Sequence, residues 1–194
     1  MENTQIDSYF DIEPVSSKHY SLFADFKCNP KSCNHHEHFN DYLRLCAVSD
    51  HSVGMGTTHV ICKYINDKPT EIIGYVTLKA ATLITEVDEY NKSLMVGKPA
   101  IEISELAIKK GYERQGYGSD LLAYIARMCK RLHDENVGIY CILVYADPKA
   151  VGFYKNKNGL KFQPISQHYI IPNEIWNKNC TPLYVKMENV YKVQ

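Results

Sequence analysis

A loop that contains two glycines, Gly116 and Gly118, carries the clearest sign of chemistry in the sequence. It lies between a strand-like run and an amphipathic run, and it reads Glu113-Arg114-Gln115-Gly116-Tyr117-Gly118-Ser119. Glycine lets a backbone approach a ligand closely, and the first N–H groups of a helix have no partner inside it. With the helix dipole they form an anion site that suits a pyrophosphate. The same glycines also occur in plain tight turns, and the loop is neither a Walker loop nor a dinucleotide fingerprint.

Strand and helix patterns on both sides must position this loop. Apolar and β-branched runs predict strands over residues 9–14, 59–64, 71–83, 100–108, 139–146 and 183–187. Asn66-Asp67-Lys68-Pro69 predicts a hairpin turn, and helical spacing predicts helices over 39–48, 118–133 and 148–155. Because no repeat or linker divides the chain, we expect one α/β domain over residues 1–194. Its mixed central sheet would hold about six to seven strands, with helices on both faces.

Charge and composition exclude several classes of protein. The 194 residues include 22 Lys plus Arg and 22 Asp plus Glu, so the formal charge is zero, which argues against a broad basic surface for nucleic acid. The 45% of hydrophobic residues includes no apolar run of ~18 residues, so no membrane span is expected. The N-terminus lacks the pattern of a secretory signal, and seven cysteines are an odd number. We therefore expect reduced thiols and a cytoplasmic location.

A second motif follows the glycine loop. After the predicted strand over 139–146 the chain reads Ala150-x-x-Phe153-Tyr154 and then Gly159-Leu160-x-Phe162. In this order the two motifs resemble the GNAT family of acetyl-CoA-dependent N-acetyltransferases, over about residues 72–162 with a closing strand at 183–187. The resemblance implies a GNAT-like sheet with a splayed cofactor cleft and acetyl-CoA as cosubstrate. It also implies direct transfer of the acetyl group to a primary amine in a ternary complex.

The resemblance also assigns cofactor contacts, most of them to the main chain. In the family, a bulged strand before the loop opens a gap in which the pantetheine arm bonds to backbone groups, and the loop takes the phosphates. The implied cofactor-binding residues are Leu106, Ala107, Ile108, Arg114, Gln115, Gly116, Tyr117, Gly118, Ser119 and Asp147. Asp147 stands where many relatives have an asparagine.

Two positions depart from the family's pattern. Glu113 occupies the first loop position, which is usually Gln or Arg, and a carboxylate there would repel a phosphate. We expect Glu113 to turn outward, with Arg114 supplying the positive charge. The spacing from Tyr154 to Gly159 is one residue longer than usual, which predicts a looser helix end.

Direct acetyl transfer needs an acid for the departing thiolate and a base for the amine. Tyr154 is the candidate acid, because the matching tyrosine of the family lies by the CoA sulfur; packing of an aromatic ring is the alternative. Glu105 is the candidate base, in an apolar strand where some relatives place a glutamate that acts through water. A carboxylate paired with Arg or Lys is the alternative there, and Glu102 and Ser104 compete from the opposite face of the strand.

Cysteines and histidines are numerous, and six of them cluster at Cys28, Cys33, His35, His36, His38 and Cys46. This spacing fits no common zinc pattern, so we expect a polar loop leading into a helix and no metal. Cys129 and Cys141 lie in hydrophobic patterns, which predicts packing and not a nucleophile.

The sequence leaves the acceptor open. An amine on a small molecule or protein is the default, with variable residues 29–56, 85–99 and 163–181 on the acceptor side. Short sequence segments around Phe26–Leu43 and Ile73–Leu78 resemble the bacterial toxin subgroup of this family, which acetylates charged tRNA. Membership of that subgroup would imply tRNA and an antitoxin as partners. A non-catalytic acyl-CoA sensor is a further alternative. Many relatives of the family form homodimers.

Overall fold

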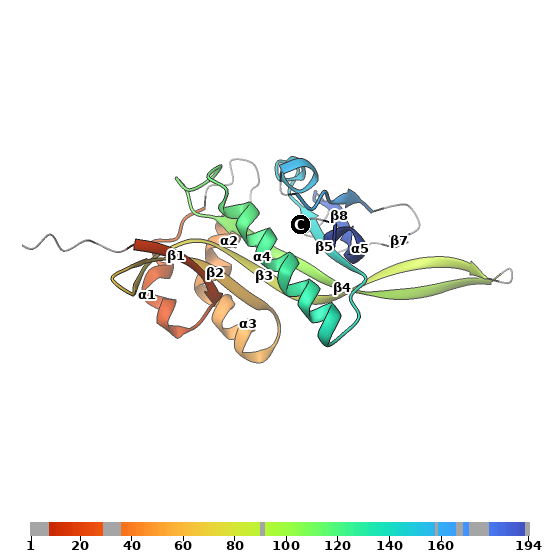
Figure 1. Ribbon diagram of the computed structural model, residues 1–194, viewed down its shortest axis with the longest axis horizontal. Coiled ribbons are helices and arrows are strands. Elements are labelled where there is room, and N and C mark those ends of the chain that lie inside the picture. The colour runs from red at the N-terminus through yellow and green to blue at the C-terminus, as the bar shows by residue number, and fades with distance from the viewer. Residues whose placement is uncertain are drawn as a thin grey trace, which may run out of the picture. The chain divides into compact units, whose positions relative to one another are not determined.

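The computed structural model describes residues 8–28, 36–89, 92–157, 159–165, 169–170 and 179–192 (Figure 1). The chain forms two compact units, each built from two separate stretches. The first unit comprises Met1–Leu78 and Glu105–Leu121, and the second comprises Lys79–Ser104 and Leu122–Gln194.

The first unit is built on three antiparallel strands, β1 (Ser8–Pro14), β2 (Thr57–Ile65) and the first part of β3 (Lys68–Glu89). Asn66 and Asp67 join β2 to β3 with φ of 50° and 60°. Two left-handed residues in a two-residue connection match the twist of the strands they join, and Asn and Asp tolerate that conformation. The hairpin predicted at this point is therefore confirmed.

Short helices cover this sheet on one side. They are η1 (Ser17–His19), α1 (Tyr20–Phe23), α2 (His36–Asp41), the π-helical turn η2 (Tyr42–Cys46) and α3 (Ala47–Val53). Apolar side chains of these helices pack against the strands in one cluster: Val15, Phe23, Phe26, Tyr42, Leu43, Ala47, Val60, Ile72, Tyr75 and Ala107. The predicted helix over 39–48 is confirmed as part of α2–η2–α3.

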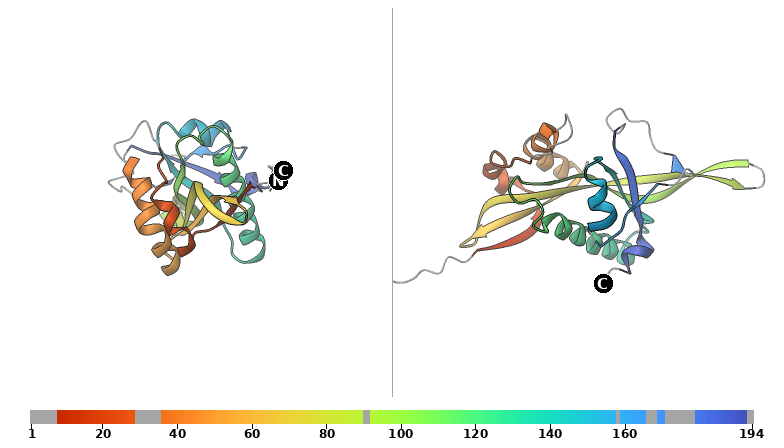
Figure 2. Two further views of the ribbon diagram at one scale, coloured as in Figure 1. Left: turned by 90° about the vertical axis from the view of Figure 1, so that its left-hand side faces the viewer. Right: turned by 90° about the horizontal axis from the view of Figure 1, so that it is seen from above.

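The second unit contains the outer parts of β3 and β4 (Lys92–Ile108), which run side by side as a long hairpin (Figure 2). β4 pairs in parallel with β5 (Cys141–Ala146), and β5 pairs antiparallel with β8 (Thr181–Lys186). The short strands β6 (Gln163–Pro164) and β7 (Tyr169–Ile170) pair with β8 and β3. α4 (Tyr117–Glu135) and α5 (Met187–Val190) complete the described helices, together with the π-helical turn η3 (Phe153–Lys157).

The predicted mixed α/β sheet is confirmed. Among the described residues the strand order is β1-β2-β3-β4-β5-β8-β6, with β7 paired to β3, and β4–β5 is a parallel pair among antiparallel neighbours. β3 and β4 are longer than predicted, because pairing with each other satisfies their backbone groups even where β4 side chains are exposed. Leu94, Met95 and Val96 are accordingly 46%, 57% and 41% exposed. In the part of the chain that is described, no helix is long and apolar enough to cross a membrane.

The predicted packing role of two cysteines is also confirmed. Cys129 in α4 is 1% exposed and Cys141 in β5 is fully buried. Burial raises the pKa of each thiol to about 12. Neither is therefore a thiolate near neutral pH, and neither acts as a nucleophile.

Candidate active site

The glycine loop leads directly into α4. Gly116 has φ of +99°, a conformation that favours glycine, and its carbonyl accepts the N–H groups of Ser119 and Asp120 at 2.8 and 3.0 Å. Helical hydrogen bonding begins with these two bonds, so the amides ahead of Ser119 are the ones that can meet an anion. Arg114 also has a positive φ, 63°, which is uncommon outside glycine and is found at functional sites.

Side chains of the loop hold its backbone in place. The Gly111 N–H donates to Glu113 Oε2 at 2.6 Å, and Gln115 Nε2 donates to the Gly111 carbonyl at 2.7 Å. Glu113 is exposed and accepts this bond within the loop. The Gln115 side chain braces the loop, and Arg114 and Gly116 are exposed.

A second set of contacts anchors the start of the loop on β3. Glu71 accepts hydrogen bonds from Lys109 Nζ at 2.6 Å and from the Tyr112 hydroxyl at 2.7 Å. Partial burial works against ionisation, yet these two bonds hold the pKa of Glu71 below its usual value. The ring of Tyr117 contacts the rings of Tyr112 and Phe10 with centroids 5.9 and 5.4 Å apart. The Tyr117 side chain therefore packs the loop, and a cofactor contact would come from its backbone.

The strand before the loop lies close to β3 at Ala107 and Ile108, and Leu106 is half-buried in the same strand. A Cβ on Gly74 of β3 would lie 2.6 Å from Ile108 Cδ1 and 3.0 Å from the Ala107 carbonyl, so only glycine fits there without a shift. The Lys109 N–H donates to the Ile73 carbonyl at 2.7 Å. On the other edge of β4, the ladder with β5 ends at Ile103 and Val144.

Glu105 is nearly buried, with 3% of its side chain exposed, and it faces the helices of the first unit. Its Oε1 lies 2.9 Å from Nε2 of His38 in α2. The predicted alternation of β4 is confirmed, since Ile103, Glu105 and Ala107 are buried while Glu102 and Ser104 are half-buried. The partner of Glu105 is a histidine, where the alternative considered from the sequence was Arg or Lys.

Aromatic residues surround the Glu105–His38 pair. The Tyr75 hydroxyl is fully buried and donates to the Phe39 carbonyl at 2.8 Å. Burial, and next the charge of Glu105, raise the pKa of Tyr75 well above its usual value. The His38 ring lies 6.4 Å from that of Tyr42, whose pKa burial raises to about 12. Both tyrosines therefore stay neutral around the pair near neutral pH.

Tyr154 and Asp147 belong to the second unit. Tyr154 is 4% exposed and lies in η3, with its ring against those of Phe153 and Phe162 at 5.1 and 5.4 Å. The wider π-helical turn follows the helical residues Val151–Gly152 and takes up the extra residue noted between Tyr154 and Gly159. Asp147 accepts the Lys149 N–H at 2.9 Å through Oδ1, and its carbonyl accepts the Ala150 N–H in the turn that precedes Val151.

The cysteine and histidine cluster noted in the sequence is not assembled among the described residues. Cys33 and His35 lie outside them, Cys46 is exposed, and Cys28 Sγ contacts Asn40 Oδ1 at 3.3 Å. His38 faces Glu105 instead.

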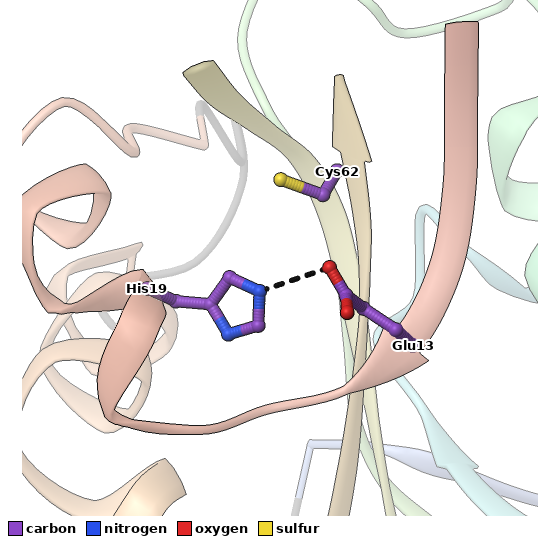
Figure 3. Close-up of side chains that lie close together, drawn as sticks. All are labelled: Glu13, His19 and Cys62. Atoms are coloured by element: carbon purple, nitrogen blue, oxygen red, sulfur yellow. Dashed lines mark hydrogen bonds and ion pairs between the residues drawn. The ribbon is translucent and has the colours of Figure 1, made fainter. Parts of the chain in front are cut away.

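A different group, Glu13, His19 and Cys62, brings its ligand atoms within 4.8 Å of one another (Figure 3). The Lys18 ammonium and the Tyr64 hydroxyl already bond to Glu13. His19 Nδ1 accepts the Ser16 N–H at 3.1 Å, so the proton of the neutral ring sits on Nε2, which faces Glu13 Oε1 at 3.1 Å. Burial raises the pKa of Cys62 to about 11. A protonated imidazole nitrogen and a neutral thiol are poor metal ligands, so this group is a hydrogen-bonded link between β1, η1 and β2.

A glycine loop at a helix N-terminus, carried by a mixed sheet, defines the class of α/β enzymes that hold an anionic cosubstrate on backbone amides. The sequence matches the model of the acetyltransferase (GNAT) family over residues 19–160. The chain therefore belongs to this family, as its motifs indicated, and is an acetyltransferase.

Solved structures of KacT and of the toxin AtaT share the fold. A tyrosine-to-phenylalanine mutant of KacT is 20% identical, with a TM-score of 0.71 over 95% of this chain and 99% of its own. A mutant AtaT toxin bound to the C-terminus of the antitoxin AtaR and acetyl-CoA is 20% identical, with a TM-score of 0.69 over 94% and 96%. AtaT complexed with acetyl-methionyl-tRNAfMet is 21% identical, with a TM-score of 0.70 over 95% and 98%.

Proposed function

We propose that this acetyltransferase moves an acetyl group from acetyl-CoA to a primary amine by direct attack in a ternary complex. One observation carries the proposal. The loop around Gly116 is braced in a conformation with two positive φ angles and opens directly onto the 19-residue helix α4. Such a loop presents backbone amides to a pyrophosphate, and the structure of AtaT with acetyl-CoA belongs to a protein of the same fold.

The cofactor contacts follow the residues named from the sequence. The amides from Gln115 to Gly118, the side chain of Ser119 and the guanidinium of Arg114 would hold the phosphates. The backbone of Leu106–Ile108 would hold the pantetheine arm, because the ladder of β4 with β5 ends before it at Ile103. The resemblance also gives Asp147 a contact with the cofactor.

The reaction needs two proton transfers, and one side chain is the candidate for each. The amine nitrogen bonds to the thioester carbon, the C–S bond breaks, and the sulfur leaves as a thiolate. Tyr154 would give its hydroxyl proton to the thiolate, since phenol and alkyl thiol differ by about 1.5 pKa units. Glu105 would act in the removal of the amine proton, as the candidate base named from the sequence.

Thiol release from acetyl-CoA with a panel of amines tests the proposal. We expect turnover with at least one amine, and Tyr154→Phe should lower kcat at least ~10-fold with little change in acetyl-CoA affinity. Tyr20→Phe, at a tyrosine 55% exposed in α1, is the matched control. Tight CoA binding without acetylation of any amine would favour the acyl-CoA sensor, and an unaltered rate would remove Tyr154 from the mechanism.

A second candidate acceptor is the amino group of an aminoacyl-tRNA. The similarity to AtaT and KacT extends over more than nine-tenths of each chain, and one of those structures is a complex with acetyl-methionyl-tRNAfMet. The zero formal charge favours an amine on a small molecule or protein as the acceptor, because binding to tRNA depends on contacts between basic side chains and phosphates. Acetylation of charged tRNA, assayed beside the amine panel, decides between them, and an antitoxin partner would follow only from the tRNA result.

A homodimer and a cytoplasmic location stay predictions. Sedimentation at several protein concentrations tests the first, and cell fractionation tests the second.

A further inference from the structure

The first unit contains a cavity of about 530 Å³ whose lining residues take no direct part in the proposed acetyl transfer. Its walls come from α1 and the chain just after it, from β2 and β3, and from the residue that follows β4. They carry two ammonium groups, those of Lys63 and Lys109, and two carboxylates, those of Asp25 and Glu71. We propose that this cavity binds a small zwitterion, a molecule with one ammonium and one carboxylate group, such as a free amino acid.

Two of these four charges already face each other. Lys109 Nζ donates to Glu71 Oε1 at 2.6 Å, and the Tyr112 hydroxyl donates to Glu71 Oε2 at 2.7 Å. Both carboxylate oxygens of Glu71 are therefore engaged. The side chains of Glu71 and Lys109 are only 26% and 17% exposed, so this pair forms a wall of the cavity on which the charges balance.

The other two charges have no such partner. In the part of the chain that the structure describes, neither the Lys63 ammonium nor the Asp25 carboxylate makes a hydrogen bond or an ion pair. Asp25 is exposed after α1, and Lys63 is half-buried in β2, opposite Glu71 in the register with β3. A ligand with a single charge attracts one of these groups and repels the other. A zwitterion attracts both, and hydrogen bonds between charged groups are the stronger kind.

The remaining lining residues add apolar surface and fix the backbone. Leu22 and Ile65 are half-buried and present hydrocarbon to the cavity. The Thr70 hydroxyl donates to the Lys63 carbonyl at 3.0 Å and so ties β3 to β2 beside Lys63. Sites for small molecules usually have volumes of roughly 300–1,000 Å³. A free amino acid fits within this cavity and would place an apolar side chain against Leu22 and Ile65.

A ligand in this cavity would lie against the support of the glycine loop, since Glu71 and Lys109 also anchor the start of that loop. The inference goes beyond acetyl transfer and does not depend on it. Binding of a zwitterion is measured without acetyl-CoA and without turnover.

NMR spectra of protein labelled at its isoleucine methyl groups test the inference, with the Ile65 signal identified by its loss in Ile65→Val. The probes are L-leucine and 6-aminohexanoate, which hold their two charges at a short and a long separation. We expect at least one of them to shift the Ile65 signal with a Kd of about 1–10 mM, because each exposed ion pair contributes little. The singly charged analogues 4-methylpentanoate, hexanoate and hexylamine should bind about 2- to 5-fold more weakly, since each forms one ion pair fewer.

Two variants assign each charge of the ligand to its partner. Asp25→Asn should weaken binding of the zwitterion about 2- to 5-fold and leave that of hexanoate unchanged. Lys63→Gln should weaken binding of the zwitterion by a similar factor and leave that of hexylamine unchanged. Lys68→Gln, at an exposed lysine of β3 outside the lining of the cavity, is the matched control and should change no Kd.

Three results would overturn the inference. They are an Ile65 signal that neither zwitterion shifts up to about 50 mM, singly charged analogues that bind as tightly as the zwitterions, and equal losses in Lys68→Gln and Lys63→Gln. The outcome is separate from that of the proposed function. A protein that acetylates no amine can still bind the zwitterion, and failure of both probes leaves the acetyl transfer untouched.

Discussion

Gly116 offers a test of the loop that needs no knowledge of the acceptor. A Cβ at Gly116 meets nothing within 4 Å, and the same is true at Gly138. The two positions differ in the backbone, because only Gly116 has a positive φ, +99°. Replacing each by alanine therefore separates backbone strain from steric contact. Holding a non-glycine residue in such a conformation costs about 1–3 kcal/mol.

The free-energy cost of this strain can appear in CoA binding or in the stability of the fold. If the free loop relaxes in Gly116→Ala, binding of CoA must restore the strained conformation, and the full cost would raise Kd about 5- to 150-fold. If the loop cannot relax, the same cost lowers the free energy of unfolding instead. We expect the two losses in Gly116→Ala to sum to about 1–3 kcal/mol and those in Gly138→Ala to be far smaller.

Titration calorimetry with CoA gives the first loss, and urea unfolding gives the second. A sum near zero for Gly116→Ala, or equal sums for the two variants, would show that the backbone at Gly116 is not strained. A loss confined to unfolding would show that the loop keeps its shape without the cofactor.

Two further outcomes follow from backbone strain and from burial. Arg114→Gly should raise the free energy of unfolding by about 1 kcal/mol, since φ of 63° no longer costs energy, while CoA binds more weakly without the guanidinium; calorimetry and urea unfolding give both values. Burial, and next the charge of His51, lower the pKa of His59 to about 4. Below pH 6.5 the unfolded chain binds this proton more readily, so unfolding at pH 5 should be easier than at pH 7 by about 2 kcal/mol more in the wild type than in His59→Gln. Equal pH dependence in both would contradict this.

Local patterns predicted those parts of the site whose chemistry is local. The glycine loop, the turn at Asn66-Asp67 and the alternation of β4 each depend on residues that are close together in the chain, and periodicity or turn chemistry reveals such features. The extra residue after Tyr154 predicted a looser helix end, and the π-helical turn η3 bears this out.

Features that depend on residues far apart in the sequence could not be predicted from local patterns. Glu105 and His38 are 67 positions apart, and only the packing of α2 against the strands of the first unit brings them together. From the sequence, His38 belonged to a histidine-rich run that was expected to form a polar loop leading into a helix, and nothing linked this run to Glu105. The outer hairpin of β3 and β4 was missed for a different reason, since two strands that pair mainly with each other need no alternating apolar face.

The cysteines of this chain set the conditions under which released CoA can be measured with a thiol reagent. Of the cysteines that the structure describes, Cys46 is exposed and Cys28 and Cys180 are half-buried. Cys62, Cys129 and Cys141 are buried, and burial raises their pKa values to about 11–12. The buried thiols react slowly while the protein is folded, so Cys46 should dominate the fast background from these residues. Replacing it by serine lowers that background. Conversely, a dye on Cys46 would lie eight residues after His38 and report on the α2–η2–α3 segment.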